Sequence, residues 1–151
     1  MRSLFAGALA LGLVSACAAG PEPTTAAPDG KPRAKVAGGV LVGESAEGIV
    51  SYQGVPFAAP PVGDFRWKAP QPVASWSGER AANESGPSCS QNSRLGAEAK
   101  VSEDCLYLNV VSAAKTADAK QPVMVFYHGG GLTSGTSSST TYNHPGLPNK
   151  G

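Results

Sequence analysis

The chain has 151 residues, a length that suits one domain, and its 12 Lys and Arg nearly balance its 11 Asp and Glu. The resulting formal net charge of +1 predicts no electrostatic attraction to nucleic acids or anionic membranes. The 19 glycines and 13 prolines favour a loop-rich chain over a helical bundle.

The first residues have the pattern of an export signal. The basic segment Met1–Ser3 precedes the apolar run Leu4–Val14, which is too short for a membrane-spanning helix of about 20 residues. The tetrad that ends at Cys17 is similar to the lipobox of bacterial lipoproteins, whose cysteine is acylated and becomes the new N-terminus. The alternative is an ordinary cleavage site beside an unrelated cysteine. We predict a signal peptide over residues 1–16 and an exported protein, anchored in the bacterial cell envelope by lipid on Cys17 or otherwise secreted.

Residues 17–35 are rich in Ala, Pro and Thr and show no apolar period, so they are predicted to form a flexible linker. The domain is expected over residues 36–151. Within it, Val36–Val42 and Gly48–Tyr52 are short runs flanked by glycines, which predicts a pair of small antiparallel strands.

A proline-rich stretch follows from Gln53 to Trp76. Aromatic residues are spaced along it and just before it, and we expect their rings to pin a long irregular loop to the core: Tyr52, Phe57, Phe65, Trp67 and Trp76.

Beyond Cys17, the cysteines are Cys89 and Cys105. In an exported protein such an even pair predicts a disulfide, which would contribute about 3 kcal/mol in the chain-entropy model. The alternative is two buried thiols.

Two apolar runs in the second half of the chain are predicted as strands. Leu106–Val111 is apolar on most of both faces, which indicates burial in a sheet that helices cover. After a polar connection over Ala113–Lys120, Val123–Tyr127 is expected to be a second strand of this buried type. It ends in His128 and three consecutive glycines.

A glycine triplet directly after a buried strand suits half of an oxyanion hole. Acyl transfer builds negative charge on the former carbonyl oxygen, and preorganised N–H donors stabilise that charge by about 2.7–4 kcal/mol each in one measured enzyme. Glycine tolerates unusual dihedral angles and lets the substrate approach the backbone. The tetrad alone fits a flexible turn equally well. We expect His128 to shape the loop by hydrogen bonding rather than to act as a base.

Three ordered segments closely resemble the type-B carboxylesterase family, whose members include cholinesterases and bacterial esterases. Tyr52–Pro72 is similar to its N-terminal block, Glu103–Val110 (EDCLYLNV) to its second sequence pattern, and Pro122–Gly135 to its oxyanion strand and loop. Cys89 stands where the disulfide partner of Cys105 is expected. The resemblance extends from Val36 to about Tyr142.

The resemblance implies an α/β class, specifically an α/β-hydrolase fold with only the N-terminal part of its sheet present. It implies hydrolysis of small-molecule carboxylic esters through an acyl-serine, without a cofactor. Gly130 and Gly131 would donate the oxyanion N–H groups, with Gly129 allowing the turn. Two departures from the pattern are Leu132, where an aromatic is usual and whose change affects the acyl pocket, and Ala113, which we expect to be harmless.

The catalytic residues themselves are missing from the sequence. A hydrolase of this kind needs a serine on a G-x-S-x-G elbow, followed by an acid and a histidine, and that pattern does not occur. Ser134 and Ser137–Ser139 are interpreted as loop serines, and His144 as structural or exposed. The sequence shows no metal-ligand spacing and no phosphate-binding loop.

We therefore expect the N-terminal part of a carboxylesterase, inactive alone and dependent on a C-terminal part beyond Gly151. The strands that would flank Leu106–Val111 and Val123–Tyr127 in this fold come later in the chain. Both runs would then expose unpaired edges, so we expect poor stability or non-native pairing. The alternatives are a cholinesterase-like binding or adhesion module and a truncated envelope lipoprotein.

Overall fold

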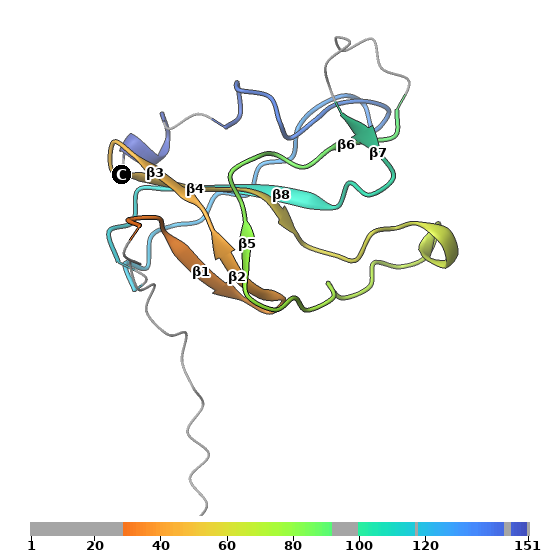
Figure 1. Ribbon diagram of the computed structural model, residues 1–151. Coiled ribbons are helices and arrows are strands. Elements are labelled where there is room, and N and C mark those ends of the chain that lie inside the picture. The colour runs from red at the N-terminus through yellow and green to blue at the C-terminus, as the bar shows by residue number, and fades with distance from the viewer. Residues whose placement is uncertain (1–28, 92–99, 117, 144–145, 151) are drawn as a thin grey trace, which may run out of the picture.

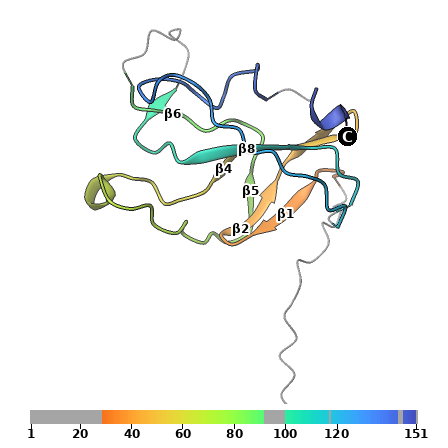
Figure 2. The same cartoon turned by 180° about the vertical axis from the view of Figure 1, so that it is seen from behind.

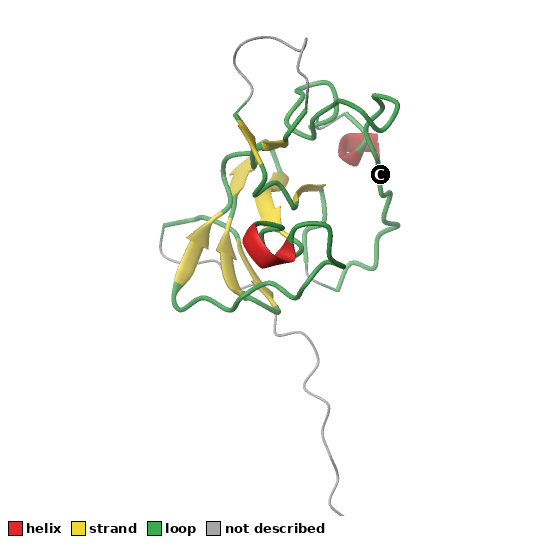
Figure 3. Ribbon diagram, turned by 90° about the vertical axis from the view of Figure 1, so that its right-hand side faces the viewer, coloured by secondary structure: helices red, strands yellow, loops and turns green. Residues whose placement is uncertain are grey.

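The computed structural model describes residues 29–91, 100–116, 118–143 and 146–150. The signal peptide, Cys17, most of the linker and His144 lie outside these residues. The described residues form short strands and two 3-10 turns, η1 (Gly63–Phe65) and η2 (Pro148–Lys150) (Figure 1, Figure 3). The strands are β1 (Arg33–Val36), β2 (Gly39–Val42), β3 (Glu44–Ala46), β4 (Ile49–Pro56), β5 (Glu79–Ala81), β6 (Ser88–Cys89), β7 (Val101–Ser102) and β8 (Tyr107–Ser112). Within these ranges no helix has the length and apolar character needed to span a membrane.

The first sheet has the order β1-β2-β5. Strands β1 and β2 form an antiparallel hairpin, and β5 adds in parallel to β2. The indole of Trp76 lies over the hairpin turn, where its Nε1–H donates to the Val40 carbonyl at 3.1 Å. A Cβ on Gly38 or Gly39 would overlap this ring, so the glycine pair makes room for the tryptophan.

The second sheet has the order β3-β4-β8. Strands β3 and β4 form a hairpin through Glu47 and Gly48, which both have positive φ, 51° and 78°, as a type I′ turn requires. The prediction that Val36–Val42 pairs with Gly48–Tyr52 is therefore wrong. Each run instead folds back on a short strand next to it in sequence, because a two-residue turn aligns adjacent strands at a lower loop-closure cost.

A β-bulge interrupts the pairing of β4 with β8. Tyr52 lies opposite Val110 and Val55 opposite Leu108, so Gln53 and Gly54 together face the single residue Asn109. Gly54 has φ +64°, and its N–H donates to the Asn109 side-chain oxygen at 3.0 Å.

The apolar core of the described residues is small. Its buried apolar residues among the described ones are Leu41, Ile49, Ala58 and Ala82. Ala82 connects the sheets, because its N–H donates to Val42 of β2 and its carbonyl accepts from Gln53 of β4.

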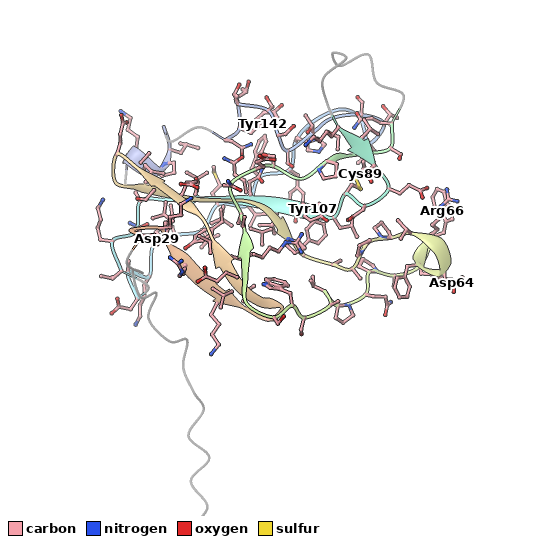
Figure 4. All side chains as sticks on the ribbon, viewed as in Figure 1. Asp29, Asp64, Arg66, Cys89, Tyr107 and Tyr142 are labelled. Atoms are coloured by element: carbon pink, nitrogen blue, oxygen red, sulfur yellow. A yellow bond between two sulfur atoms is a disulfide. The ribbon has the colours of Figure 1, made fainter. Side chains whose placement is uncertain are left out.

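A disulfide joins Cys89 of β6 to Cys105, just before β8, with an S–S distance of 2.07 Å (Figure 4). The predicted bridge is confirmed. It attaches the small β6-β7 sheet to the main sheet.

The proline-rich loop between β4 and β5 projects from the sheets (Figure 1). Trp76 holds its C-terminal end as expected, but Phe57, Phe65 and Trp67 are exposed, Trp67 by 96%. The prediction that these three rings pin the loop is wrong for the described residues. An ion pair of 2.7 Å between Arg66 and Glu103 ties the tip of the loop toward the disulfide instead.

Two predictions of burial are also wrong. β8 is the edge strand of its sheet, with Leu108 and Val110 exposed by 39% and 42%. Val123–Tyr127 is not a strand, and each of its side chains is more than half exposed. Within the described ranges no strand pairs with this run, and a strand without a partner leaves its backbone groups to solvent.

Candidate functional site

The segment His128–Gly135 folds into a tight glycine-rich turn. The Gly130 carbonyl accepts hydrogen bonds from the N–H groups of Thr133 and Ser134, at 3.1 and 3.2 Å. Gly130 has φ +130° and Gly131 φ +61°, conformations that favour glycine. A Cβ on Gly130 would overlap the Ser134 carbonyl, so the turn closes only with glycine at this position.

The N–H groups of Gly130 and Gly131 are available for a ligand. Both residues are exposed, and neither N–H donates to any of the described residues. The Gly130 carbonyl is occupied by hydrogen bonds within the turn, so this acceptor does not compete for the two N–H groups. An acceptor oxygen bound there would find the kind of site that suits an oxyanion.

Two neighbours of the triplet complete its shape. The Nδ1 atom of His128 lies 2.9 Å from the Gly129 carbonyl oxygen, so Nδ1 carries the proton of this hydrogen bond. His128 thus lies where the sequence analysis expects it, as a loop-shaping residue. Leu132 adopts φ +62° and is fully exposed, at a backbone cost of about 1–2 kcal/mol for a residue with a Cβ.

The side-chain amide of Gln91 connects this turn to the disulfide region. Its Nε2 donates to the Gly135 carbonyl and its Oε1 accepts from the Gly135 N–H, both at 2.7 Å. The same Nε2 lies 3.1 Å from the Cys89 carbonyl. Both opposite views show the blue loop beside β6 (Figure 1, Figure 2).

Asn109 of β8 holds the next part of the loop. Its Nδ2 donates to the Ser137 carbonyl at 3.0 Å and to Asn143 Oδ1 at 3.2 Å. Its Oδ1 accepts the hydrogen bond from the Gly54 N–H in the bulge. Asn143 also donates to Ser137, at 2.7 Å. The loop is thereby fixed to the β4–β8 pair behind it.

No serine in the described ranges has the partners of a nucleophile. Ser134 Oγ lies 3.5 Å from the Gly130 carbonyl, Ser138 Oγ bonds Thr136 at 2.7 Å, and Ser139 Oγ accepts from the Thr141 N–H. None of these hydroxyls bonds a histidine. The same ranges contain no group of three or more His, Cys, Asp and Glu that could hold a metal ion.

The predicted glycines are thus placed in one exposed turn, and their oxyanion role remains a prediction. Sequence reasoning missed Gln91, Gly135 and Asn109. Gln91 acts across 44 residues and Asn109 across 28, and neither contact leaves a local signal.

Comparison with known proteins identifies the chain. The model of the carboxylesterase family matches residues 30–151. Fumonisin B1 esterase of Sphingopyxis macrogoltabida is 42% identical over 72% of this chain and 21% of its own length. Juvenile hormone esterase of Tribolium castaneum is 42% identical over 69% of this chain and 18% of its own. The chain spans about a fifth of the length of these curated relatives.

Solved structures show the same relationship. A PNB esterase superposes with a TM-score of 0.67 at 37% identity, over 74% of this chain and 23% of the esterase. A carboxylesterase of Geobacillus stearothermophilus gives a TM-score of 0.64 at 41% identity, over 73% and 22%. The chain therefore belongs to the type-B carboxylesterase family, and it carries part of an α/β-hydrolase domain.

Proposed function

We propose that this chain supplies the oxyanion-binding loop of a carboxylic ester hydrolase, with Gly130 and Gly131 as the donors and Gly129 allowing the turn. The observation that carries the proposal is the pair of exposed N–H groups in a turn where the Gly130 carbonyl is bonded to Thr133 and Ser134. The nucleophilic serine, the acid and the catalytic histidine come from sequence outside these 151 residues. The substrates are small carboxylic esters, as expected for the family.

In the proposed reaction, the serine attacks the ester carbonyl and the carbonyl oxygen becomes negatively charged. The N–H groups of Gly130 and Gly131 then hold that oxygen, and they gain strength as the charge develops. By itself the chain would bind the oxygen side of the substrate but break no bond.

A fusion tests the oxyanion role. The chain would replace the matching segment of the PNB esterase, and ester hydrolysis would be compared for Gly131→Ala and Gly63→Ala. Both glycines have positive φ, +61° and +54°, and at both an added Cβ meets no atom within 4 Å. The backbone cost is therefore matched, but only at Gly131 would the methyl group obstruct the substrate.

We expect Gly131→Ala to lower kcat/KM by at least about tenfold and Gly63→Ala to leave it within about twofold. Equal activity of the two variants would contradict the assignment.

The absence of a nucleophile is tested on the chain alone. A fluorophosphonate probe forms a covalent bond with an activated serine, so we expect no labelling of the 151-residue chain and no turnover of p-nitrophenyl esters. Labelling of Ser134 or Ser137–Ser139 would show that one of these serines is activated.

We also propose that the protein is exported and anchored through lipid on Cys17, on the strength of the tetrad Val14–Cys17. After expression in a bacterium, the protein should enter the detergent phase in Triton X-114 partitioning, and Cys17→Ser should move it to the aqueous phase. Equal partitioning of the two forms would contradict the anchor.

A further inference from the structure

We infer that Gln91 is a positioning residue for the oxyanion loop, whose side-chain amide fixes the backbone of Gly135 and thereby the orientation of the Gly130 and Gly131 N–H groups. This inference rests on the proposed function of the two glycines.

The carboxamide of Gln91 pairs with both backbone groups of one residue. It donates to the Gly135 carbonyl and accepts from the Gly135 N–H, each at 2.7 Å, in a partly buried position. A side-chain amide offers a donor and an acceptor in one plane, as a peptide group does. Two hydrogen bonds to the same residue define the orientation of its backbone as well as its position.

The same carboxamide also bonds the disulfide region. Its Nε2 donates to the Cys89 carbonyl at 3.1 Å. Cys89 belongs to β6 and is bonded to Cys105, which lies two residues before β8. Gln91 therefore links Gly135 of the loop to the strands that the disulfide joins.

A displacement of Gly135 would also displace the glycine triplet, because the two segments lie in close contact. Gly135 has φ +127°, and a Cβ on it would overlap His128 Nδ1 and lie 2.6 Å from the Gly129 carbonyl. On the other side of the turn, the Ser134 N–H donates to Gly130. Gly135 thus lies against His128 and Gly129, and Ser134 is bonded to Gly130. Both residues of this peptide are therefore next to the segment that carries the proposed donors.

Gln91→Leu removes all three hydrogen bonds of this side chain, two to Gly135 and one to Cys89, with little change in side-chain volume. Gln71→Leu is the matched control, because Gln71 Nε2 likewise donates to the carbonyl two residues earlier, Ala69, at 2.8 Å. Gln71 lies in the projecting loop and its side chain has no bond to the segment 128–135 among the described residues.

The first measurement is amide hydrogen exchange by NMR on the whole 151-residue chain. We expect the Gly135 amide to be protected, and Gln91→Leu to accelerate its exchange by at least about tenfold while Gln71→Leu leaves it unchanged. A Gly135 amide without protection in the unsubstituted chain would overturn the inference.

The second measurement is catalysis by the PNB-esterase fusion, with active sites counted by phosphonate titration. A lost transition-state interaction lowers kcat per titrated site and leaves KM nearly unchanged. We expect Gln91→Leu to lower kcat by at least about tenfold, with KM within about twofold, because small displacements of donors have large effects. A merely structural role would lower the number of titrated sites and leave kcat per site unchanged, which would overturn the inference.

The Gly131→Ala fusion separates the two possible failures. If Gly131→Ala leaves kcat/KM unchanged and Gln91→Leu leaves kcat unchanged, the oxyanion assignment itself fails. If Gly131→Ala impairs the fusion and Gln91→Leu does not, only the role of Gln91 is wrong.

Discussion

At the scale of the residue, Asn109 resolves a problem that the bulge creates. Two residues of β4 face one residue of β8 there, so the Gly54 N–H cannot find a carbonyl partner in the regular ladder. The Asn109 side chain supplies the acceptor at 3.0 Å and uses its amide group to hold Ser137 of the loop. One side chain thus satisfies the sheet and positions the loop.

We predict that Asn109→Leu lowers the free energy of opening at the Gly54 amide by about 1–3 kcal/mol, the cost of a partly buried polar group left without a partner. Native-state hydrogen exchange at Gly54 measures this change. Asn109→Asp is the control, because it keeps the acceptor oxygen and should preserve the protection of Gly54. Equal exchange rates in all three proteins would show that Asn109 carries no part of this bond.

The residues of the site were predictable where chemistry is local. The Gly triplet predicts a turn with unusual dihedral angles, and a pair of cysteines in a chain predicted to be exported indicates a bridge; both features are present in the structure. Gln91 could not be found in this way, because its partner Gly135 is brought to it only by the fold. A glutamine in a polar loop looks the same in sequence whether it fixes a turn or faces solvent.

At the scale of the element, a set of charges joins strands that are far apart in sequence. Arg33 of β1 bonds Glu79 of β5 through two contacts, one of 3.0 Å between Nη2 and Oε2, and bonds Asp29 at 2.8 Å. The hydrogen bond from Arg33 is the main cause that lowers the pKa of Asp29 to about 2, and it also lowers the pKa of Glu79.

The sign of the pH dependence follows from these shifts. Carboxyl groups with lowered pKa hold their protons less tightly in the fold than in the unfolded chain, so they stabilise the fold at high pH. Their contribution is complete above the ordinary values, 3.8 for Asp and 4.5 for Glu, and is lost as the pH falls through the lowered pKa of each group, which is about 2 for Asp29.

We predict that an NMR titration of the side-chain carboxyl carbons will place the pKa of Asp29 near 2, and that Arg33→Gln will return it toward 3.8. The exposed Asp118 serves as an internal control, because Thr116 and its own backbone, not Arg33, lower its pKa. An Asp29 pKa near 3.8 in the unsubstituted protein would contradict the pairing. Since these groups are exposed, added salt should weaken the shift.

Strand formation shows where sequence pattern stops being sufficient. The hairpin of β3 and β4 forms because Glu47 and Gly48 can take positive φ and the partner strand is adjacent in sequence. Val123–Tyr127 has a stronger apolar, β-prone pattern, yet it forms no strand and pairs with none of the described strands. Propensity describes the side chains, whereas a sheet also requires a second backbone at hydrogen-bonding distance.

At the scale of the whole molecule, the described chain has little core and much apolar surface. Four of its apolar residues are buried, while Val123, Met124, Val125, Phe126 and Tyr127 are all more than half exposed. Leu108 and Val110 add an apolar face on an edge strand. In PNB esterase the matching part is about a quarter of the protein. Neighbouring exposed apolar side chains of this kind favour association with another polypeptide.

We predict that the isolated chain self-associates through these faces, because an unpaired edge with apolar side chains can pair with another copy. Sedimentation velocity at tens of micromolar should show oligomers or aggregates. Val125→Lys should shift the distribution toward monomer, since a charge opposes burial of the segment. Thr141→Lys adds the same charge at an exposed polar site and should change nothing. A monodisperse monomer with a cooperative thermal transition would instead show that the apolar residues of this chain fold against one another, and that the surface described for Val123–Tyr127 is not exposed in solution.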